Sequence, residues 1–205
     1  SSCAMPMRVA VCVSGRGSNL IALLDRLESS PAAAVVLVLT DRADAPALAR
    51  ARERGVATVV LRDYRDAAAW LGPLGEVQTE LLVLAGFLKL VPAEVVQAFR
   101  GRIINLHPAL LPQFGGPGMY GRRVHEAVLA SGTRESGATV HLVTEEYDRG
   151  VILAQARVPV LPDDSPETLA ARVQAVEHRL LPAVVLEAAR VGRPVPLSTP
   201  LELTP

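Results

Sequence analysis

The sequence is poor in aromatic residues, cysteine and lysine. Phe, Trp and Tyr make up 3% of its 205 residues, only two cysteines occur, and Lys89 is the single lysine. So few aromatic side chains argue against nucleic-acid binding by base stacking. Basic and acidic residues balance at 21 each, and no cationic stripe marks a polyanion or an anionic membrane as a partner. We therefore expect neither nucleic-acid nor membrane binding.

Long apolar runs, a secretion signal and a cysteine framework are also missing. No run approaches the roughly 20 apolar residues of a membrane span, and residues 1–7 lack the basic start and apolar core of a signal peptide. Cys3 and Cys12 are too few for a disulfide framework, and Cys12 lies in an apolar run. The four histidines show neither HxH nor HExxH spacing, so no metal site is expected. These absences predict a cytoplasmic protein without a bound metal.

Apolar runs alternate with helical patterns along most of the chain. The runs are continuous, which is typical of parallel strands covered on both faces. This βαβ alternation predicts an α/β fold with a doubly wound, mostly parallel sheet and a Rossmann-like N-terminal half. We expect strands at residues 8–13, 34–40, 56–61, 81–85 and 103–106, and helices at 19–28, 45–54, 66–71 and 93–99.

The pattern changes after residue 107. A loop rich in Gly and Pro at 112–121 precedes an expected helix at 122–131 and strands at 139–143 and 151–158. A long helix is expected from Ser165, because Pro166 suits a first helical turn and Glu167 lies near the positive end of the helix dipole.

A short Gly-containing loop at residues 14–19 follows the first expected strand and opens the first helix. Small residues there let backbone N–H groups and the helix N-terminus face an anion; a tight turn with Ser18 as helix cap is the other interpretation. Leu20 stands where a dinucleotide fingerprint needs its third glycine, although Asp41 could act as the ribose-binding acid. The loop therefore suits a phosphomonoester better than a dinucleotide.

An amide and an imidazole lie two residues apart where the fifth strand ends. Alternation along a strand puts Asn105 and His107 on the same face, and Pro108 keeps His107 extended. Ligand and catalytic sites of α/β proteins usually lie at the carboxyl edge of the parallel sheet. This pair therefore indicates a catalytic site, but it does not by itself identify the reaction. Asp148 lies in a polar loop that can return to this edge, but by itself it reads as a turn residue. Packing or surface positions are favoured for the other histidines, His125, His141 and His178.

Four segments occur in the order and spacing of a known family: SGRGSN at 14–19, LAGFLKL at 84–90, INLHPALLP at 104–112, and Asp148-x-Gly150. Over residues 8–193 the chain resembles the phosphoribosylglycinamide formyltransferases, folate-dependent enzymes of purine biosynthesis. The resemblance implies transfer of the formyl group of 10-formyltetrahydrofolate to the amine of 5'-phosphoribosylglycinamide, in de novo IMP synthesis. It implies no metal, small-molecule partners only, and a monomer or homodimer.

The resemblance also implies roles for individual residues. Asn105 and His107 would donate hydrogen bonds to a tetrahedral oxyanion, and Asp148 would steady a protonated His107 and assist proton transfer. Seven residues match the phosphate, glycinamide and ribose positions: Gly17, Ser18, Asn19, Gly86, Pro108, Gln174 and Glu177. Eight match folate positions: Arg65, Leu84, Leu88, Lys89, Leu90, Val91, Asn105 and Val143.

Other readings stay open at this point. A 10-formyltetrahydrofolate hydrolase would use a similar domain with water as acceptor, and a nucleotide-binding oxidoreductase or a Rossmann-like binding module belongs to a different class. The loop at 115–121 lengthens the stretch before His141, and its role is open. We expect a single domain at 8–193, with a phosphate-binding half at 8–100 and a catalytic and folate-binding half at 101–193. Residues 1–7 are expected to be a disordered or non-native leader, and 194–205 a proline-rich tail.

Overall fold

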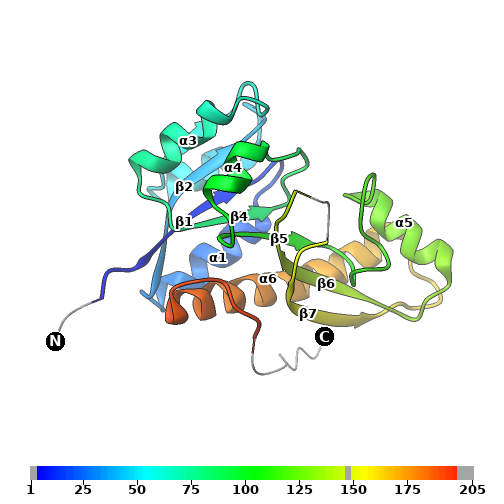
Figure 1. The fold of residues 1–205 in the computed structure, drawn as a ribbon. Helices are drawn as coiled ribbons and strands as arrows, with labels where there is room; N and C mark the ends of the chain where they lie inside the picture. Colours follow the sequence, from blue (N-terminus) through cyan, green and yellow to red (C-terminus); the bar gives the residue numbers. More distant parts are fainter. Residues whose placement is uncertain (1–3, 146–148, 198–205) are drawn as a thin grey trace.

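The computed structural model of the chain describes residues 4–145 and 149–197. Within them, seven strands form one sheet in the order β3-β2-β1-β4-β5-β6-β7 (Figure 1). The strands are β1 (Met7–Cys12), β2 (Ala33–Thr40), β3 (Thr58–Val60), β4 (Leu81–Ala85), β5 (Ile103–His107), β6 (Glu135–Leu142) and β7 (Ile152–Pro159). The helices are α1 (Ser18–Glu28), α2 (Pro46–Glu53), α3 (Ala67–Glu76), α4 (Ala93–Ala98), α5 (Arg122–Ser131) and α6 (Pro166–Val191).

The sheet is mostly parallel. Strands β1 to β5 pair in parallel, whereas β6 runs antiparallel to both β5 and β7. This confirms the doubly wound α/β fold expected from the alternating pattern. The strand order reverses between β1 and β4, and at such a point the loops beyond the carboxyl ends of the strands separate and leave a crevice.

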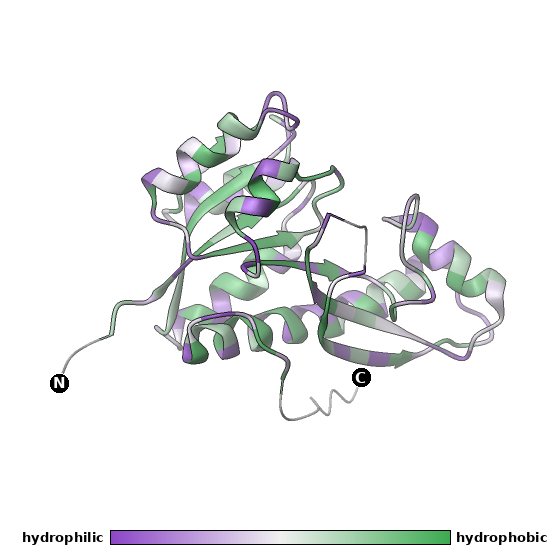
Figure 2. Cartoon of the chain, in the orientation of Figure 1, coloured by the Kyte–Doolittle hydropathy of each residue, from purple (hydrophilic) through white to green (hydrophobic). Residues whose placement is uncertain are grey.

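The centre of the sheet is buried on both faces. In β1, Val9 and Val11 belong to one hydrophobic core, whereas Ala10 and Cys12 belong to the other. Helices α1 and α6 lie against the first face, and α3 and α4 against the second (Figure 1). Figure 2 shows central strands that are hydrophobic along their length beside helices of mixed hydropathy. The continuous apolar runs are thus strands covered on both sides.

Several boundaries differ from the expected ones by a residue or more, and three of these differences have a structural reason. Strand β1 begins at Met7, whose side chain is buried in the core, so residue 7 belongs to the fold and not to a leader. Helix α3 continues through Pro73 to Glu76 because Trp70 and Leu74, four residues apart, are both fully buried. Strand β6 begins at Glu135, four residues early, because this stretch pairs with β7.

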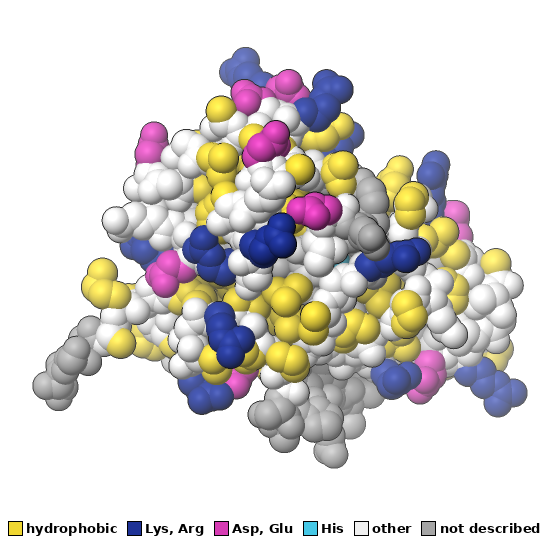
Figure 3. Space-filling model, viewed as in Figure 1, with side chains coloured by type: hydrophobic (Ala, Val, Ile, Leu, Met, Phe, Trp, Pro, Cys, Tyr) yellow, Lys and Arg dark blue, Asp and Glu magenta, His cyan; other side chains and the backbone are white. Residues whose placement is uncertain are grey.

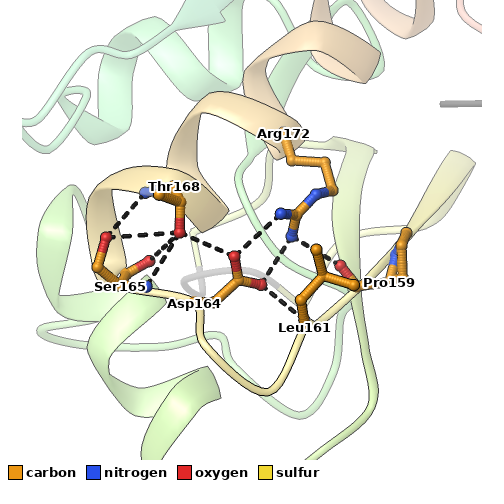
Figure 4. Close-up of polar contacts among 6 residues, drawn as sticks. All are labelled: Pro159, Leu161, Asp164, Ser165, Thr168 and Arg172. Carbon is orange, nitrogen blue, oxygen red and sulfur yellow. Dashed lines mark hydrogen bonds and ion pairs between the residues drawn. The ribbon is translucent and has the colours of Figure 1, made fainter.

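Helix α6 has a dense polar start (Figure 4). The Ser165 hydroxyl accepts from the Thr168 backbone N–H at 3.2 Å, and the Ser165 N–H donates to the Thr168 hydroxyl at 2.9 Å. Asp164 accepts two hydrogen bonds from the Arg172 guanidinium, at 2.7 and 2.9 Å. This reciprocal cap fixes the N-terminus of the helix that carries Glu177.

Strand β7 forms one edge of the sheet. The chain after α6 covers part of this edge, since the Leu197 N–H donates to the Leu153 carbonyl at 3.0 Å. Ile152, the first residue of β7, and Val151 before it are exposed. In Figure 3, hydrophobic side chains gather over α6 and the hairpin that β6 and β7 form, and Lys and Arg side chains lie around them.

Candidate active site

Two adjoining cavities open at the carboxyl edge of the sheet. The first cavity, of about 180 Å³, is lined mainly by apolar side chains: Leu84, Phe87, Lys89, Leu90, Val91, Ala93, Val96, Asn105, His141, Val143, Thr144 and Glu145. The second, of about 320 Å³, is lined by Asn19, Gly86, Phe87, Leu88, Lys89, Asn105, Leu106, His107, Pro108, the loop at 116–121 and Glu177. Phe87, Lys89 and Asn105 line both, so they mark the boundary between the two cavities.

Asn105 lies on β5 opposite His141 of β6. Its Nδ2 is 3.1 Å from His141 Nε2, and His141 Nδ1 is 2.9 Å from the Leu142 carbonyl oxygen. A carbonyl only accepts, so Nδ1 carries the hydrogen and Nε2 accepts from the Asn105 amide. One Nδ2 hydrogen of Asn105 is thereby used to orient the amide, and the second remains able to donate into the cavity.

His107 ends β5 and is buried. Its Nε2 lies 2.6 Å from the Phe114 carbonyl oxygen, so this nitrogen carries a hydrogen and donates it. His125 of α5 is also buried, and its pKa lies below the ordinary value, first because of desolvation and second because of the nearby His107. Burial and the nearby His107 thus both disfavour the charged form of His125.

The loop before α1 approaches α2 and α6 closely. Gly17 has a φ of +76°, and a Cβ there would lie 2.7 Å from the Ala47 Cβ, so only glycine fits without a shift. Ser18 accepts a hydrogen bond from the Gln174 side-chain amide at 2.8 Å. These contacts hold the first turn of α1. The N–H groups of a first helical turn have no partner within the helix and point out of its N-terminal end, where they can bind an anion.

A buried pair joins α1 to α6 beside the second cavity. Asn19 Nδ2 donates to Glu177 Oε2 at 2.8 Å, and both residues are at least 91% buried, with exposed fractions of 9% and 8%. Desolvation raises the pKa of the Glu177 carboxyl, and the bond from Asn19 opposes this in part. Two residues 158 positions apart are thus brought together as polar walls of one cavity.

The predicted residues separate into groups. Leu84, Lys89, Leu90, Val91, Val143 and Asn105 line the first cavity, and Asn19, Gly86, Asn105, His107, Pro108 and Glu177 line the second. Ser18 and Gln174 contact one another beside the loop that holds Gly17. Asp148 lies outside the described residues.

Two of the residues expected at folate positions do not line the first cavity. Leu88 lines the second cavity and not the first, whereas its neighbours Phe87 and Lys89 lie at the boundary and line both cavities. Arg65 lines neither cavity; it pairs with Asp63 at 3.3 Å and lies over the Tyr64 ring, which Lys89 also contacts. Their folate roles stay predictions.

Several lining residues were not predicted. His141 was expected to be a packing or surface residue, but it bonds to Asn105 and lines the first cavity. Its alternation with apolar neighbours placed it on a strand face; the pairing register of β5 with β6, which puts it opposite Asn105, is not visible in either segment alone. The loop at 116–121 forms one wall of the second cavity, which gives the inserted residues a position beside the substrate-sized space.

Metal and membrane features can be judged for the described ranges. Across residues 4–145 and 149–197, no group of three or more His, Cys, Asp or Glu side chains could hold a metal ion. No helix in the same ranges combines the length and the apolar character needed to cross a membrane.

Burial, and after it the charge of Asp41, raises the pKa of the Cys12 thiol, which argues against a nucleophilic role.

The chain is similar to known formyltransferases over most of its length. The formyl transferase family profile matches residues 7–185. The chloroplastic phosphoribosylglycinamide formyltransferase of Arabidopsis thaliana is 46% identical over 186 residues, which cover 87% of this chain and 64% of the relative. The chain thus spans less than two thirds of that protein's length.

Bacterial proteins match over a larger share of their own length. The phosphoribosylglycinamide formyltransferase of Escherichia coli is 37% identical, with 87% of this chain and 85% of the relative covered. The crystal structure of the enzyme of the same name from Anaplasma phagocytophilum superposes with a TM-score of 0.85 at 36% identity, covering 91% of this chain and 88% of that one. The chain therefore belongs to the formyl transferase family and, within it, to the phosphoribosylglycinamide formyltransferases.

Proposed function

We propose that this protein transfers the formyl group of 10-formyltetrahydrofolate to the amine of 5'-phosphoribosylglycinamide, in de novo purine (IMP) biosynthesis. The observation that carries the proposal is the position of Asn105, which lines both cavities, the second of which also has Asn19, His107 and Glu177 in its wall. A donor at this boundary could stabilise the oxyanion that forms when an acyl group passes from one substrate to the other. The family relationship supports this choice of substrates.

The first cavity is assigned to the folate. Leu84, Leu90, Val91 and Val143 provide apolar walls for a flat pterin ring, and such sites usually combine apolar walls with a few polar groups. Lys89 lies at the cavity's edge over the Tyr64 ring, 5.5 Å from its centroid. Its charge, with that of Arg65 over the same ring, suits the anionic tail of a folate.

The second cavity is assigned to the phosphoribosylglycinamide. Gly17, Ser18 and Asn19 at the start of α1 suit its phosphate, because a helix N-terminus and glycine backbone favour anions. Gln174 and Glu177 face this loop from α6 and suit the ribose hydroxyls. Gly86 and Pro108 would line the path of the glycinamide.

The reaction proposed is a direct attack by the substrate amine. Its lone pair forms a bond to the formyl carbon, and the formyl oxygen becomes an oxyanion. Asn105 would donate its second Nδ2 hydrogen to that oxygen. Protonated His107 would donate another from Nδ1, because its Nε2 hydrogen goes to the Phe114 carbonyl. One preorganised donor of this kind is typically worth about 3–4 kcal/mol of barrier.

Collapse of this intermediate requires one proton transfer. The amine loses a proton, the bond between the formyl carbon and folate N10 breaks, and N10 gains a proton, which leaves tetrahydrofolate. Asp148 would steady His107 and carry this proton, directly or through a water. The oxyanion donors act on the transferred carbonyl itself, so this route needs no covalent bond to the enzyme.

A spectrophotometric assay tests the proposal. Purified protein is mixed with 10-formyltetrahydrofolate, or a stable deaza analogue, with and without phosphoribosylglycinamide, and folate product absorbance is followed. We expect product only with the amine, and at least about a hundredfold slower turnover for His107→Ala and for Asp148→Asn. Turnover that ignores the amine would instead show a hydrolase, and parental rates in both variants would remove these residues from the mechanism.

A further inference from the structure

Ser14 and Asp41 line neither cavity, yet their side chains contact each other tightly. Ser14, two residues after the end of β1, is 3% exposed. Its hydroxyl donates to Asp41 Oδ1 at 2.7 Å and accepts from the Leu88 backbone N–H at 3.0 Å. A hydroxyl has one hydrogen to donate, and here it is donated to the Asp41 carboxylate. The lone pairs of the Ser14 oxygen are therefore free to accept from the Leu88 N–H.

Ser14 holds the chain after β4 at a second point. Its backbone N–H donates to the Gly86 carbonyl at 3.1 Å. Gly86 has a φ of +75°, so the chain turns sharply where it leaves β4. The segment at 86–89 is thus fastened to Ser14 on both sides of Phe87.

This segment is the wall between the two cavities. Phe87 and Lys89 line both, and Gly86 and Leu88 line the second. Ser14 is also the first residue of the loop that leads to Gly17, so one side chain connects the proposed phosphate site to the proposed folate site. Asp41 follows β2 and adds a third strand end to the contact.

We propose that Ser14 and Asp41 are positioning residues, which hold the 86–89 segment at a fixed place relative to the phosphate loop and so align the two substrates. Asp41 acts through Ser14 by fixing its hydroxyl rotor, and a chain of hydrogen bonds of this kind is strengthened by polarisation. The inference rests on the proposed function for its kinetic consequence. The hydrogen bond to Leu88 itself stands independently of that function.

Ser14→Ala is the direct test. Loss of the acceptor should speed hydrogen exchange at the Leu88 amide about tenfold or more, because that N–H loses its partner. It should lower kcat for formyl transfer about tenfold or more, with smaller changes in both KM values, because misalignment of reacting groups acts mainly on the chemical step. Asp41→Ala should resemble it, whereas Asp41→Asn keeps an acceptor oxygen and should stay within about threefold of the parent.

Matched controls separate positioning from general damage. Ser136 is another buried serine, with a side-chain oxygen that has no partner in the described ranges, so Ser136→Ala should leave Leu88 exchange and kcat unchanged. Asp44→Asn removes a nearby charge that pairs with Arg42 at the surface, and should also have no effect. The double variant Ser14→Ala/Asp41→Ala should be no slower than Ser14→Ala, because both residues act through one contact.

Parental Leu88 exchange in Ser14→Ala would overturn the proposal, as would faster exchange with a parental kcat. Equal losses in Asp41→Asn and Asp41→Ala would contradict the role of the acceptor oxygen. If the parent protein transferred no formyl group, the proposed function would fail. Exchange at Leu88 in the unliganded protein would still decide whether Ser14 holds the segment.

Discussion

Asn105 Nδ2 donates to His141 Nε2 across 3.1 Å, between directly paired positions of β5 and β6. The antiparallel strand added to the parallel part of the sheet therefore supplies the group that orients the amide. His141 is itself fixed, since its Nδ1 donates to the Leu142 carbonyl. The amide that we assign to the oxyanion is thus held before substrate arrives, and preorganisation of this kind is what lowers a barrier.

Replacing His141 should slow the chemical step. We expect His141→Leu to lower the single-turnover rate of formyl transfer about tenfold, because the amide can then turn its oxygen toward the reacting carbonyl. His141→Gln keeps an acceptor and should recover most of the rate. His178 lies on α6 and lines neither cavity, so His178→Gln serves as the control. A parental rate in His141→Leu would contradict the orienting role.

Gly17 gives a test of the phosphate loop. Gly17→Ala places a Cβ against Ala47 at a left-handed φ, which costs about 1–2 kcal/mol for an L-residue and displaces the loop. The KM for phosphoribosylglycinamide should rise more than the KM for the folate. Gly15, in the same loop, has open space around its Cα. Steady-state kinetics of Gly15→Ala should match the parent; an equal rise in KM for both variants would argue against a specific role of Gly17.

The buried Glu177 predicts a pH dependence of stability. The pKa of its carboxyl is raised in the folded chain, so the folded chain binds the carboxyl proton more tightly than the unfolded chain does. The stabilisation is complete below the ordinary glutamate pKa of about 4.3 and is lost as pH rises through the raised value. We expect the free energy of unfolding of Glu177→Gln, measured by urea titration, to fall less than that of the parent as the pH rises from about 4 to about 8.

The same variant should weaken catalysis. Glu177→Gln removes a ribose acceptor in the proposed function, so the KM for phosphoribosylglycinamide should rise while stability at neutral pH increases. Glu76 is exposed at the end of α3, and Glu76→Gln should follow the parent in both measurements. A parallel pH dependence of stability in Glu177→Gln and the parent would refute the burial argument.

The cap of α6 should affect stability without affecting chemistry. Ser165→Ala loses the hydrogen bond to the Thr168 N–H and should cost about 1 kcal/mol of unfolding free energy, read from thermal or urea unfolding. Ser165→Asp supplies another good N-cap and should restore it. Both variants should keep the parental kcat, because the cap (Figure 4) lines neither cavity. A large fall in kcat would show that the helix start positions Glu177 for the reaction.

The neighbouring Asp164 adds an acid sensitivity. Its pKa is lowered, chiefly by the hydrogen bonds from Arg172. Such a carboxylate stabilises the fold above the ordinary aspartate range, and this contribution is lost as pH falls through the lowered value. Asp164→Asn should therefore unfold more easily than the parent at neutral pH, with the difference shrinking in acid. A difference independent of pH would assign the effect to packing alone.

Local patterns were sufficient for most of the fold. The apolar runs gave β4 with its observed bounds, because a strand buried on both faces is continuous in sequence. Strand β5, with Asn105 and His107 at its end, followed from the same run and from Pro108. Features set by distant partners were missed: β6 starts early because it pairs with β7, and α3 continues past Pro73 because Trp70 is buried.

The site followed the same division. Most of the residues carried over by resemblance line one of the two cavities. Leu88 was expected with the residues of the first cavity but lines the second, because contacts with Ser14 set the path of the chain after Gly86. Arg65 lines neither cavity. His141 needed the register of two antiparallel strands to be seen beside Asn105. The residues that orient the site were thus harder to predict than those that face the substrate.

The proposed reaction moves a formyl group from 10-formyltetrahydrofolate to the substrate amine. A carbon-13-labelled formyl group can be followed directly by NMR, with phosphoribosylglycinamide and catalytic amounts of the protein. We expect the label to move to an N-formyl amide as tetrahydrofolate forms in equal amount, and Asn105→Ala to slow this transfer. Release of the label as free formate, at the same rate with or without the amine, would contradict it.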